Sequence, residues 1–353
     1  MINEQLARGS NYAVQGAMLV YTIAFFMYIA EWVFGSRSRF VLTETVADGG
    51  AAVLVGASVG TSVGASIGAP VGGRPRGGVR DQFQENLGDE PDPTVHNGDF
   101  RADKWGRMAI SLSILGFVLH SAAVLLRGLA AHRAPWGNLY EFSVAGSCVA
   151  MALYLLLLWK KDARWLGLFV TGTIVLILGV AYVLLYKDAE QLVPALHSYW
   201  LAIHVTAAVI CSGLFTVASV TTVLYLFKAN YEKRAKIGTA RPGSVWERVP
   251  SAMRLDLTAY RILAFAFPVW TFTVIAGSIW AERAWGRYWG WDPTETWAFI
   301  TWVTYAAYLH ARATMGWKGR NAAIIALLGY GAFIFNYFIV SLFVNGMHSY
   351  AGV

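Results

Sequence analysis

The chain has 353 residues, of which 56% are hydrophobic and only 14% charged, and its formal net charge is +7. So little polar surface excludes a soluble globular protein of this size and predicts an all-α polytopic integral membrane protein. The positive charge falls in loops between apolar runs and there is no soluble basic domain to carry it, so we expect no nucleic-acid partner.

Eight apolar runs follow one another along the chain, each about as long as a helix must be to cross the hydrocarbon core of a bilayer. No basic start and small-residue cleavage site marks the first run as a signal peptide, so we expect it to remain in the mature protein. The pattern predicts about eight transmembrane helices, over residues 12–34, 106–127, 139–159, 165–187, 199–228, 258–281, 296–314 and 321–345.

The first and second runs are separated by residues 35–104, which open with a Gly/Ala/Ser/Val tract and continue into a Pro, Arg, Asp and Glu mixture. This composition is typical of a disordered linker or insertion. The tract at about 49–73 is an alternative ninth span, although its glycines disfavour a helix. We therefore predict an N-terminal transmembrane helix (1–34), a cytoplasmic Gly/Ala-rich linker (35–104) and a transmembrane core (105–353).

Lys and Arg positions predict the orientation, because short cytoplasmic loops carry the positive excess. Loop 229–257 holds six basic residues, and the shorter loops at Lys160–Arg164 and Lys318–Arg320 agree with it. These loops should be cytoplasmic, which leaves both termini and the 282–295 loop on the outer, periplasmic face of the cell membrane. Arg127 and Arg133 are exceptions to the rule on that face.

The two cysteines, Cys148 and Cys211, lie inside predicted helices. Neither belongs to a Cys-x-x-Cys pair or to the Cys-x-x-Cys-His of covalent haem attachment. The chain is therefore neither a dithiol reductase nor a c-type cytochrome, and both thiols are interpreted as small hydrophobic packing residues.

Tryptophan is concentrated in one region, since eight of the fifteen Trp fall between Trp270 and Trp317. An aromatic belt at headgroup depth accounts for one or two of them, but not for this clustering around two acids, Asp292 and Glu295. We predict a platform for a flat ligand at the membrane surface, formed by Trp285, Trp289, Trp291 and Trp297.

Asp292 precedes Pro293, and an acid before a proline at the first helical position is a common helix start. A carboxylate in this place can also orient a ligand imidazole through a hydrogen bond. The sequence favours the capping role and is compatible with both.

Two histidines are predicted to lie at the level of this platform. His204 falls about one turn into span 199–228 from the outer face, and His348 falls just beyond the last span. A hydrogen-bonded interfacial imidazole is a reasonable alternative for either one alone. Two imidazoles at one depth beside aromatic rings match the axial ligands of a bis-histidine haem site, so we predict that His204 and His348 are haem-iron ligands.

His310 lies near the cytoplasmic end of span 296–314, as a second haem ligand or as a histidine that reaches the membrane surface. At 1.5 Å per residue it lies within roughly 10 Å of that end, whereas His120 lies about 20 Å from the same end of its own helix. A partner imidazole from another subunit is therefore at least as good an interpretation as His120, which otherwise is a packed polar residue. The loop residues His96, His132 and His197 are weaker candidates, His197 being an alternative outer ligand.

The run from Trp280 to Trp297, with His204 upstream and His310 and His348 downstream, resembles the CcsA/ResC family. These are the WWD-domain subunits of the system II cytochrome c synthase, labelled CcsB in some organisms. The resemblance extends from about Arg107 to the C-terminus and includes Pro135-Trp-Gly-Asn-Leu-Tyr-Glu141. It does not account for residues 35–104, nor for His197, where another polar residue is expected.

The resemblance implies a holocytochrome c synthase (haem lyase) that needs a CcsB/ResB-like membrane subunit. Non-covalent haem b would cross from the cytoplasmic side and be presented at the WWD loop to the Cys-x-x-Cys-His of an apocytochrome c, whose thiols a thioredoxin-like pathway keeps reduced. It further implies that His204, His348 and Asp292 form the catalytic site, and that His310 ligates haem within the membrane together with a histidine of the other subunit.

Three alternatives remain at this point. A WWD-type haem-handling protein of the other bacterial maturation pathway fits the Trp loop, but the eight-helix layout and the His348-Ser-Tyr350 terminus disfavour it. A quinol-oxidising electron carrier needs ligand pairs at matched depths, which the mismatch of His120 and His310 disfavours. A haem transporter or exporter without attachment activity fits the topology as well as a synthase does.

Overall fold

The computed structural model describes residues 2–48, 93–161, 163–190, 198–241 and 244–348. Its regular elements within these ranges are all helical, which confirms the all-α prediction. They are α1 (Glu4–Asp48), α3 (Pro93–Ala131), α4 (Leu139–Lys160), η1 (Arg164–Leu166), α5 (Gly167–Leu184), α6 (Tyr199–Lys236), η3 (Val245–Arg248), α7 (Ala252–Trp285), α8 (Pro293–Thr314), α9 (Arg320–Ile334), the π-helical η4 (Phe335–Val340) and α10 (Ser341–Phe343).

Each of the eight predicted spans coincides with a helical segment. Seven helices in the described ranges are long and apolar enough to cross a bilayer, which confirms a polytopic membrane protein. The remaining predicted span, α8, is 22 residues long but is rich in Thr, Tyr and Trp, and it does not reach the hydropathy of the other seven. Which face of the membrane each end occupies stays a prediction.

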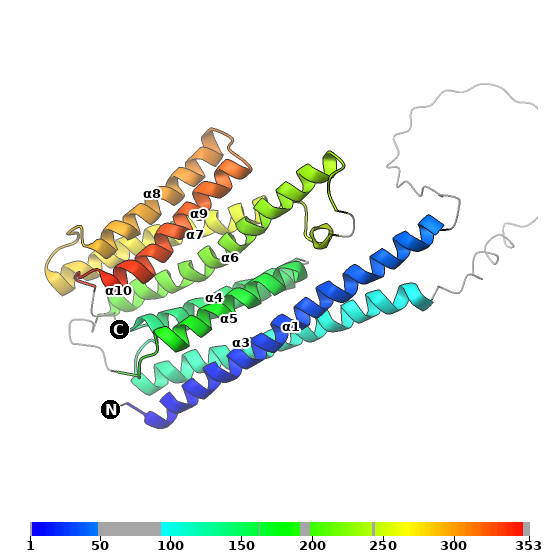
Figure 1. Cartoon of the computed structure of the whole chain (residues 1–353). Helices are drawn as coiled ribbons and strands as arrows, with labels where there is room; N and C mark the ends of the chain where they lie inside the picture. Colours follow the sequence, from blue (N-terminus) through cyan, green and yellow to red (C-terminus); the bar gives the residue numbers. More distant parts are fainter. Residues whose placement is uncertain (1, 49–92, 162, 191–197, 242–243, 349–353) are drawn as a thin grey trace, which may run out of the picture.

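The helices flanking the predicted linker are longer than the apolar sequence indicates. Helix α1 continues to Asp48 and α3 begins at Pro93, so both ends of the 35–104 segment are helical. Residues 49–92, including the tract considered as a ninth span, lie outside the described residues. Figure 1 shows that α1 and α3 run side by side and extend past the other helices at one end of the bundle.

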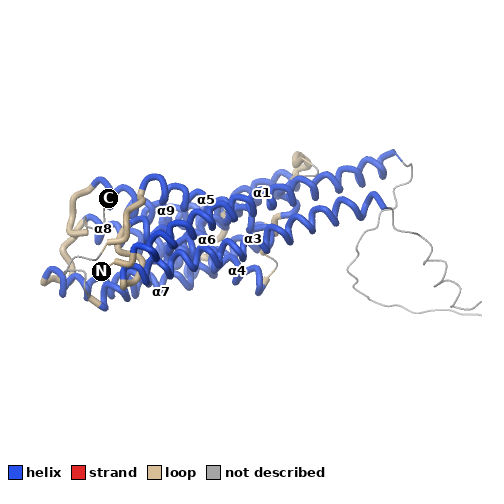
Figure 2. Tube along the Cα trace, turned by 90° about the horizontal axis from the view of Figure 1, so that it is seen from below, coloured by secondary structure: helices blue, strands red, loops and turns tan. Residues whose placement is uncertain are grey.

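The remaining helices form a bundle around α6, which packs against α4, α7 and α9 (Figures 1 and 2). Glycine permits one of these close approaches: a Cβ on Gly213 of α6 would lie 2.8 Å from the backbone nitrogen of Ala150 in α4. Small residues let membrane helices meet backbone to backbone in this way. The start of α1, the α7–α8 connection and the end of α10 lie at the same end of the bundle (Figure 1).

A buried ion cluster ties α3 to α4 at that end. The side chain of Glu141, with no exposed surface, accepts hydrogen bonds from Arg127 at 3.0 Å and from Arg133 at 2.7 Å. Arg133 also donates to the carbonyl oxygen of Glu190. Removing one partner of a buried ion pair leaves an uncompensated buried charge. The two arginines therefore have a structural role, which is to neutralise Glu141 between α3 and α4. This role is compatible with the prediction that both arginines lie on the outer face, against the positive-inside pattern.

Candidate functional site

The Trp-rich loop joins α7 to α8 and is fixed by a capping box. Helix α7 ends at Trp285, and Gly286 follows it with a φ of 71°. Asp292 caps α8, where its side chain accepts from the Thr294 amide at 3.2 Å, and Glu295 accepts in return from the Asp292 amide at 3.1 Å. The predicted cap is confirmed, because Asp-Pro with a Glu three residues later satisfies the first free amides of the helix.

The same carboxylate holds the C-terminal segment. Asp292 Oδ2 lies 2.8 Å from His348 Nδ1, and Oδ1 accepts from the Met347 amide at 2.6 Å. Burial raises the pKa of Asp292, but the hydrogen bonds from His348 and Met347 outweigh burial and leave the pKa below its ordinary value. Asp292 is thus an ionised acceptor that both starts α8 and orients the His348 ring.

His204, in the second turn of α6, is oriented from α7. Its Nδ1 lies 2.8 Å from the backbone carbonyl oxygen of Thr273. A carbonyl only accepts, so Nδ1 carries the proton and Nε2 carries a free lone pair. The carboxylate of Asp292 assigns the same tautomer to His348. No residue in the described part of the chain hydrogen-bonds either Nε2.

Trp280 brings the two imidazoles together. The His204 ring stacks on it at a centroid distance of 6.3 Å and an angle of 8°, and the His348 ring packs on it at 5.8 Å. Trp285 contacts His348 edge to face at 4.9 Å. Trp280 is buried, and its Nε1 has no hydrogen-bond acceptor among the described residues. A buried N–H without an acceptor is costly and is satisfied when a ligand or water supplies one.

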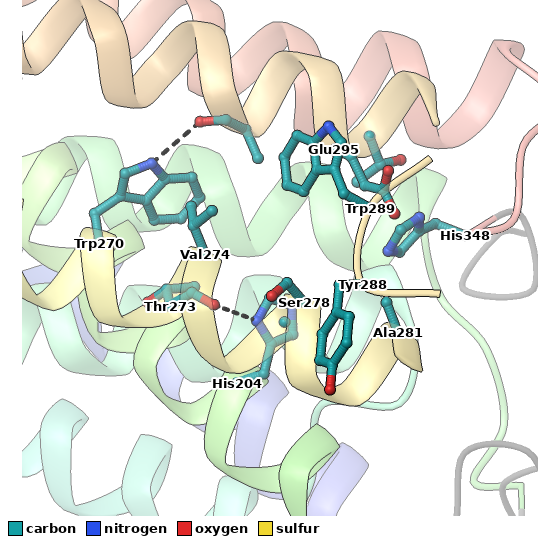
Figure 3. A pocket seen from close by; sticks show the side chains of 13 residues that line it. His204, Trp270, Thr273, Val274, Ser278, Ala281, Tyr288, Trp289, Glu295 and His348 are labelled. Atoms are coloured by element: carbon teal, nitrogen blue, oxygen red, sulfur yellow. Dashed lines mark hydrogen bonds between the residues drawn. The ribbon is translucent and has the colours of Figure 1, made fainter. Parts of the chain in front are cut away.

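A cavity of about 80 Å³ lies beside these rings, between α6, α7, α8 and the C-terminal segment. Figure 3 shows His204 and His348 approaching it from two sides, with Tyr288 of the loop between them in this view and Trp289 above them, beside Glu295. Ligand pockets commonly measure roughly 300–1,000 Å³. A haem-sized ligand therefore does not fit inside this cavity and would keep part of its surface outside, against the loop.

The four tryptophans predicted as a platform have different surroundings. Trp289 lines the cavity, whereas Trp285 contacts the His348 ring and is not among the lining residues. Trp291 is 65% exposed and packs edge-on against Trp289, with a φ of 56° that is unusual for a bulky residue. Such backbone strain is found at functional sites when the surrounding structure enforces it. Trp297 packs against Phe335 at 4.2 Å and does not line the cavity.

His310 lies at the other end of α8 from Asp292, and its side chain is exposed on the surface of the chain. His120, by contrast, is fully buried: its Nε2 lies 2.8 Å from the Val144 carbonyl oxygen and its Nδ1 3.5 Å from the Tyr21 hydroxyl. The two residues are not brought together, and both ring nitrogens of His120 have partners. Of the weaker candidates, His132 lies in the turn after α3, and the side chains of His96 and His197 lie outside the described residues.

Four site residues on α7 and its loop were not predicted: Thr273, Gly277 and Trp280, which orient or contact His204, and Tyr288, which lines the cavity. A Cβ on Gly277 would lie 2.7 Å from the His204 ring. Thr273, Gly277 and Trp280 recur at helical spacing on one face. That stripe is the signal that could have identified them.

The family model and the relatives that match this chain all describe proteins of cytochrome c assembly or biogenesis. The sequence model of the family described as "Cytochrome C assembly protein" matches residues 136–348. A relative named "Cytochrome c biogenesis protein CcsA" in Synechococcus sp. (strain JA-2-3B'a(2-13)) is 33% identical over 291 residues, covering 67% of this chain and 83% of the relative. The proteins of that name in Synechococcus elongatus and Marchantia polymorpha are 35% and 32% identical, covering 64% and 68% of this chain and 81% and 86% of the relatives.

Proposed function

Because this chain belongs to the cytochrome c assembly proteins, of the CcsA/ResC type, and takes part in cytochrome c biogenesis, we propose that it presents haem at the His204–His348 site for attachment to apocytochrome c. One observation carries the proposal. Both imidazoles are held by Nδ1, neither Nε2 has a hydrogen-bond partner among the residues that the structure describes, and both rings pack on Trp280 beside one cavity.

The residues fit haem as a substrate. The Nε2 atoms of the two imidazoles would supply two nitrogen ligands to the haem iron. Asp292 makes His348 a stronger ligand, as carboxylate partners of ligating histidines do. The indole of Trp289, which lines the cavity, offers a flat surface to the macrocycle.

The chemistry requires positioning rather than activation. Each cysteine thiol adds across one haem vinyl group, its sulfur bonding to one carbon and its hydrogen to the other, so two thioethers form without net oxidation. Holding thiol and vinyl in contact geometry converts an encounter between two molecules into a step within one complex, which is worth several orders of magnitude in rate. The thiols must arrive reduced, for which we assign a thioredoxin-like reductant pathway.

Release of the product requires one axial ligand to yield to the histidine of the Cys-x-x-Cys-His substrate. His204 lies within a long helix, whereas His348 follows α10 in the C-terminal segment and its side chain is 23% exposed. We assign the exchanging position to His348 and the anchoring position to His204. Asp292 then keeps the displaced imidazole close to the iron, so that it can ligate the next haem.

The proposal extends to the rest of the pathway. Haem would enter from the cytoplasmic side of the plasma membrane, with the Trp-rich loop on the outer face. His310 is exposed on α8 and available to another chain, so we assign it as a ligand shared with a histidine of a CcsB/ResB-like subunit. Synthase activity would then require both subunits.

The test is reconstitution of this chain with that subunit in vesicles, supplied with reduced haem and a peptide containing Cys-x-x-Cys-His. Mass spectrometry should detect haem joined to the peptide by two thioethers, and a peptide with Ser in place of both Cys should remain unmodified. Haem that crosses the membrane without any thioether product would identify a transporter instead.

A further inference from the structure

A second cavity lies at the opposite end of the bundle from the histidine site. Its volume is about 420 Å³, within the range of ordinary ligand pockets. The end of α4, the η1 segment and the first turns of α7 line it. Thr258 of this cavity and Ala281 of the histidine site both lie on α7, and at 1.5 Å per residue they are separated by roughly 35 Å of helix. The two cavities are therefore separate sites.

The lining combines an apolar wall with three cations. Leu157, Trp165, Leu166 and Leu257 form the apolar part, and Lys161, Arg254 and Arg261 supply the positive charge. Arg254 and Arg261 are seven residues apart on α7, so they lie two turns apart on one face. None of the three cationic side chains forms an ion pair with a residue that the structure describes, and the described lining contains no acid.

The position of the cavity along the bundle corresponds to the membrane surface. Its residues fall at the ends of the apolar runs 139–159 and 258–281, where hydrocarbon gives way to headgroups. Trp165 is typical of that level. Basic pockets between transmembrane helices near the membrane surface bind the headgroups of acidic lipids.

We propose that this cavity binds one anionic phospholipid, with its phosphate between Lys161, Arg254 and Arg261 and its acyl chains along Leu157 and Leu257. Such a lipid fills the gap between α4 and α7 at the end of the bundle where the predicted cytoplasmic loops gather. The proposal is independent of the histidine site and of haem presentation.

The test uses the full chain in lipid nanodiscs that contain equal amounts of phosphatidylglycerol and phosphatidylcholine, followed by native mass spectrometry of the released protein. The wild-type protein should retain phosphatidylglycerol preferentially. Replacing Lys161, Arg254 and Arg261 together by Gln should lower the affinity on the order of 100-fold, since each basic residue near the membrane surface contributes about fivefold.

Two further variants make the result specific. Replacing Lys233, Arg234 and Lys236 of α6 by Gln removes the same charge from exposed positions outside the cavity and should leave lipid retention unchanged. Thr258→Phe occupies the cavity while keeping every cation and should abolish retention. If the triple cavity variant fails to fold, Thr258→Phe still tests whether the cavity holds the lipid.

Equal loss of lipid in the cavity and control variants, or full retention in Thr258→Phe, would overturn the proposal. A porphyrin dicarboxylate added at the concentration of the lipid is the remaining check. It should leave phosphatidylglycerol bound, and displacement of the lipid by the porphyrin would show that the cavity takes the tetrapyrrole instead.

Discussion

His348 Nδ1 lies 2.8 Å from Asp292 Oδ2, across 56 residues of sequence, and this contact joins the end of the chain to the start of α8. The same carboxylate caps the helix. The position of the His348 ring is therefore fixed by the element that carries the Trp-rich loop, and the two parts of the site cannot move independently.

Asp292→Asn tests this coupling. Asparagine is as good a helix cap as aspartate, so α8 should form normally. The amide has one acceptor oxygen where the carboxylate has two, and it carries no charge. The hydrogen bond from His348 Nδ1 should therefore weaken. Loss of such a partner typically costs about 10–100-fold in metal affinity, and haem titration of the purified protein should show a loss in that range.

Glu295→Gln is the comparison variant, because Glu295 belongs to the same capping box and lines the same cavity, but it accepts from the amides of Gly290 and Asp292 and from Arg287 and not from His348. It should retain more haem than Asp292→Asn. Equal haem affinity in Asp292→Asn and the wild type would show that the contact does not orient a ligand.

Gly277→Ala tests the fit of His204 against α7. The added Cβ would lie 2.7 Å from the imidazole, so the ring must shift. Displacement of a reacting group by about 1 Å can cost on the order of 100-fold in rate, and attachment should slow by that order. Gly179→Ala adds the same atom where nothing lies within 4 Å and should leave the rate unchanged. Equal rates in both variants would contradict the assigned position of His204.

Trp289→Ala and Trp291→Ala separate ligand contact from membrane anchoring. Trp289 lines the cavity, and its loss should lower haem retention about tenfold, the value of one large aromatic contact. Trp291 should have a smaller effect, since its ring is mostly exposed. Trp159 lies near the end of α4 and is 81% exposed. Trp159→Ala is therefore the control for a tryptophan that only anchors the protein in the membrane surface. If all three variants retain haem equally and change only membrane insertion, the belt interpretation holds.

His310→Ala and His120→Ala should behave differently. His310→Ala should reduce the haem delivered to the His204–His348 site in the assembled complex while leaving stability unchanged, because the side chain is exposed. His120→Ala should leave the haem load of the His204–His348 site intact and lower stability by about 1–3 kcal/mol, because it removes a fully buried side chain together with its hydrogen bond to the Val144 carbonyl oxygen. Thermal unfolding and haem content measure the two effects. A normal haem load in His310→Ala would end the relay proposal.

Hydropathy predicted the helices but not their ends. Hydropathy shows where the apolar sequence ends. A helix can continue past that point, because polar residues also form helix outside the hydrocarbon core. Helix α6 therefore runs to Lys236, past the predicted end at residue 228, and α1 runs to Asp48. The prediction that His204 and His348 lie at the same depth required only the order of the spans. The sequence was therefore sufficient for it.

The details of the site depend on contacts that sequence spacing does not contain. Asp-Pro predicted the cap of α8, but the contact with His348 exists because α9, η4 and α10 return the chain to the loop. Clustering of Trp predicted a platform without showing which rings face it. Trp297 is in α8 and packs on Phe335, whereas Trp280, not predicted as a contact, packs against both imidazoles.

The most direct test of the central claim is the reduced-minus-oxidised spectrum of the purified complex, recorded for the wild type, His204→Ala and His348→Ala. The wild type should carry non-covalent haem with a low-spin, bis-histidine spectrum. Each variant should lose haem or hold it in an easily oxidised form, and added imidazole should partly restore the spectrum by occupying the vacated position. Wild-type haem content and an unchanged spectrum in both variants would contradict the assignment of His204 and His348 as the haem ligands.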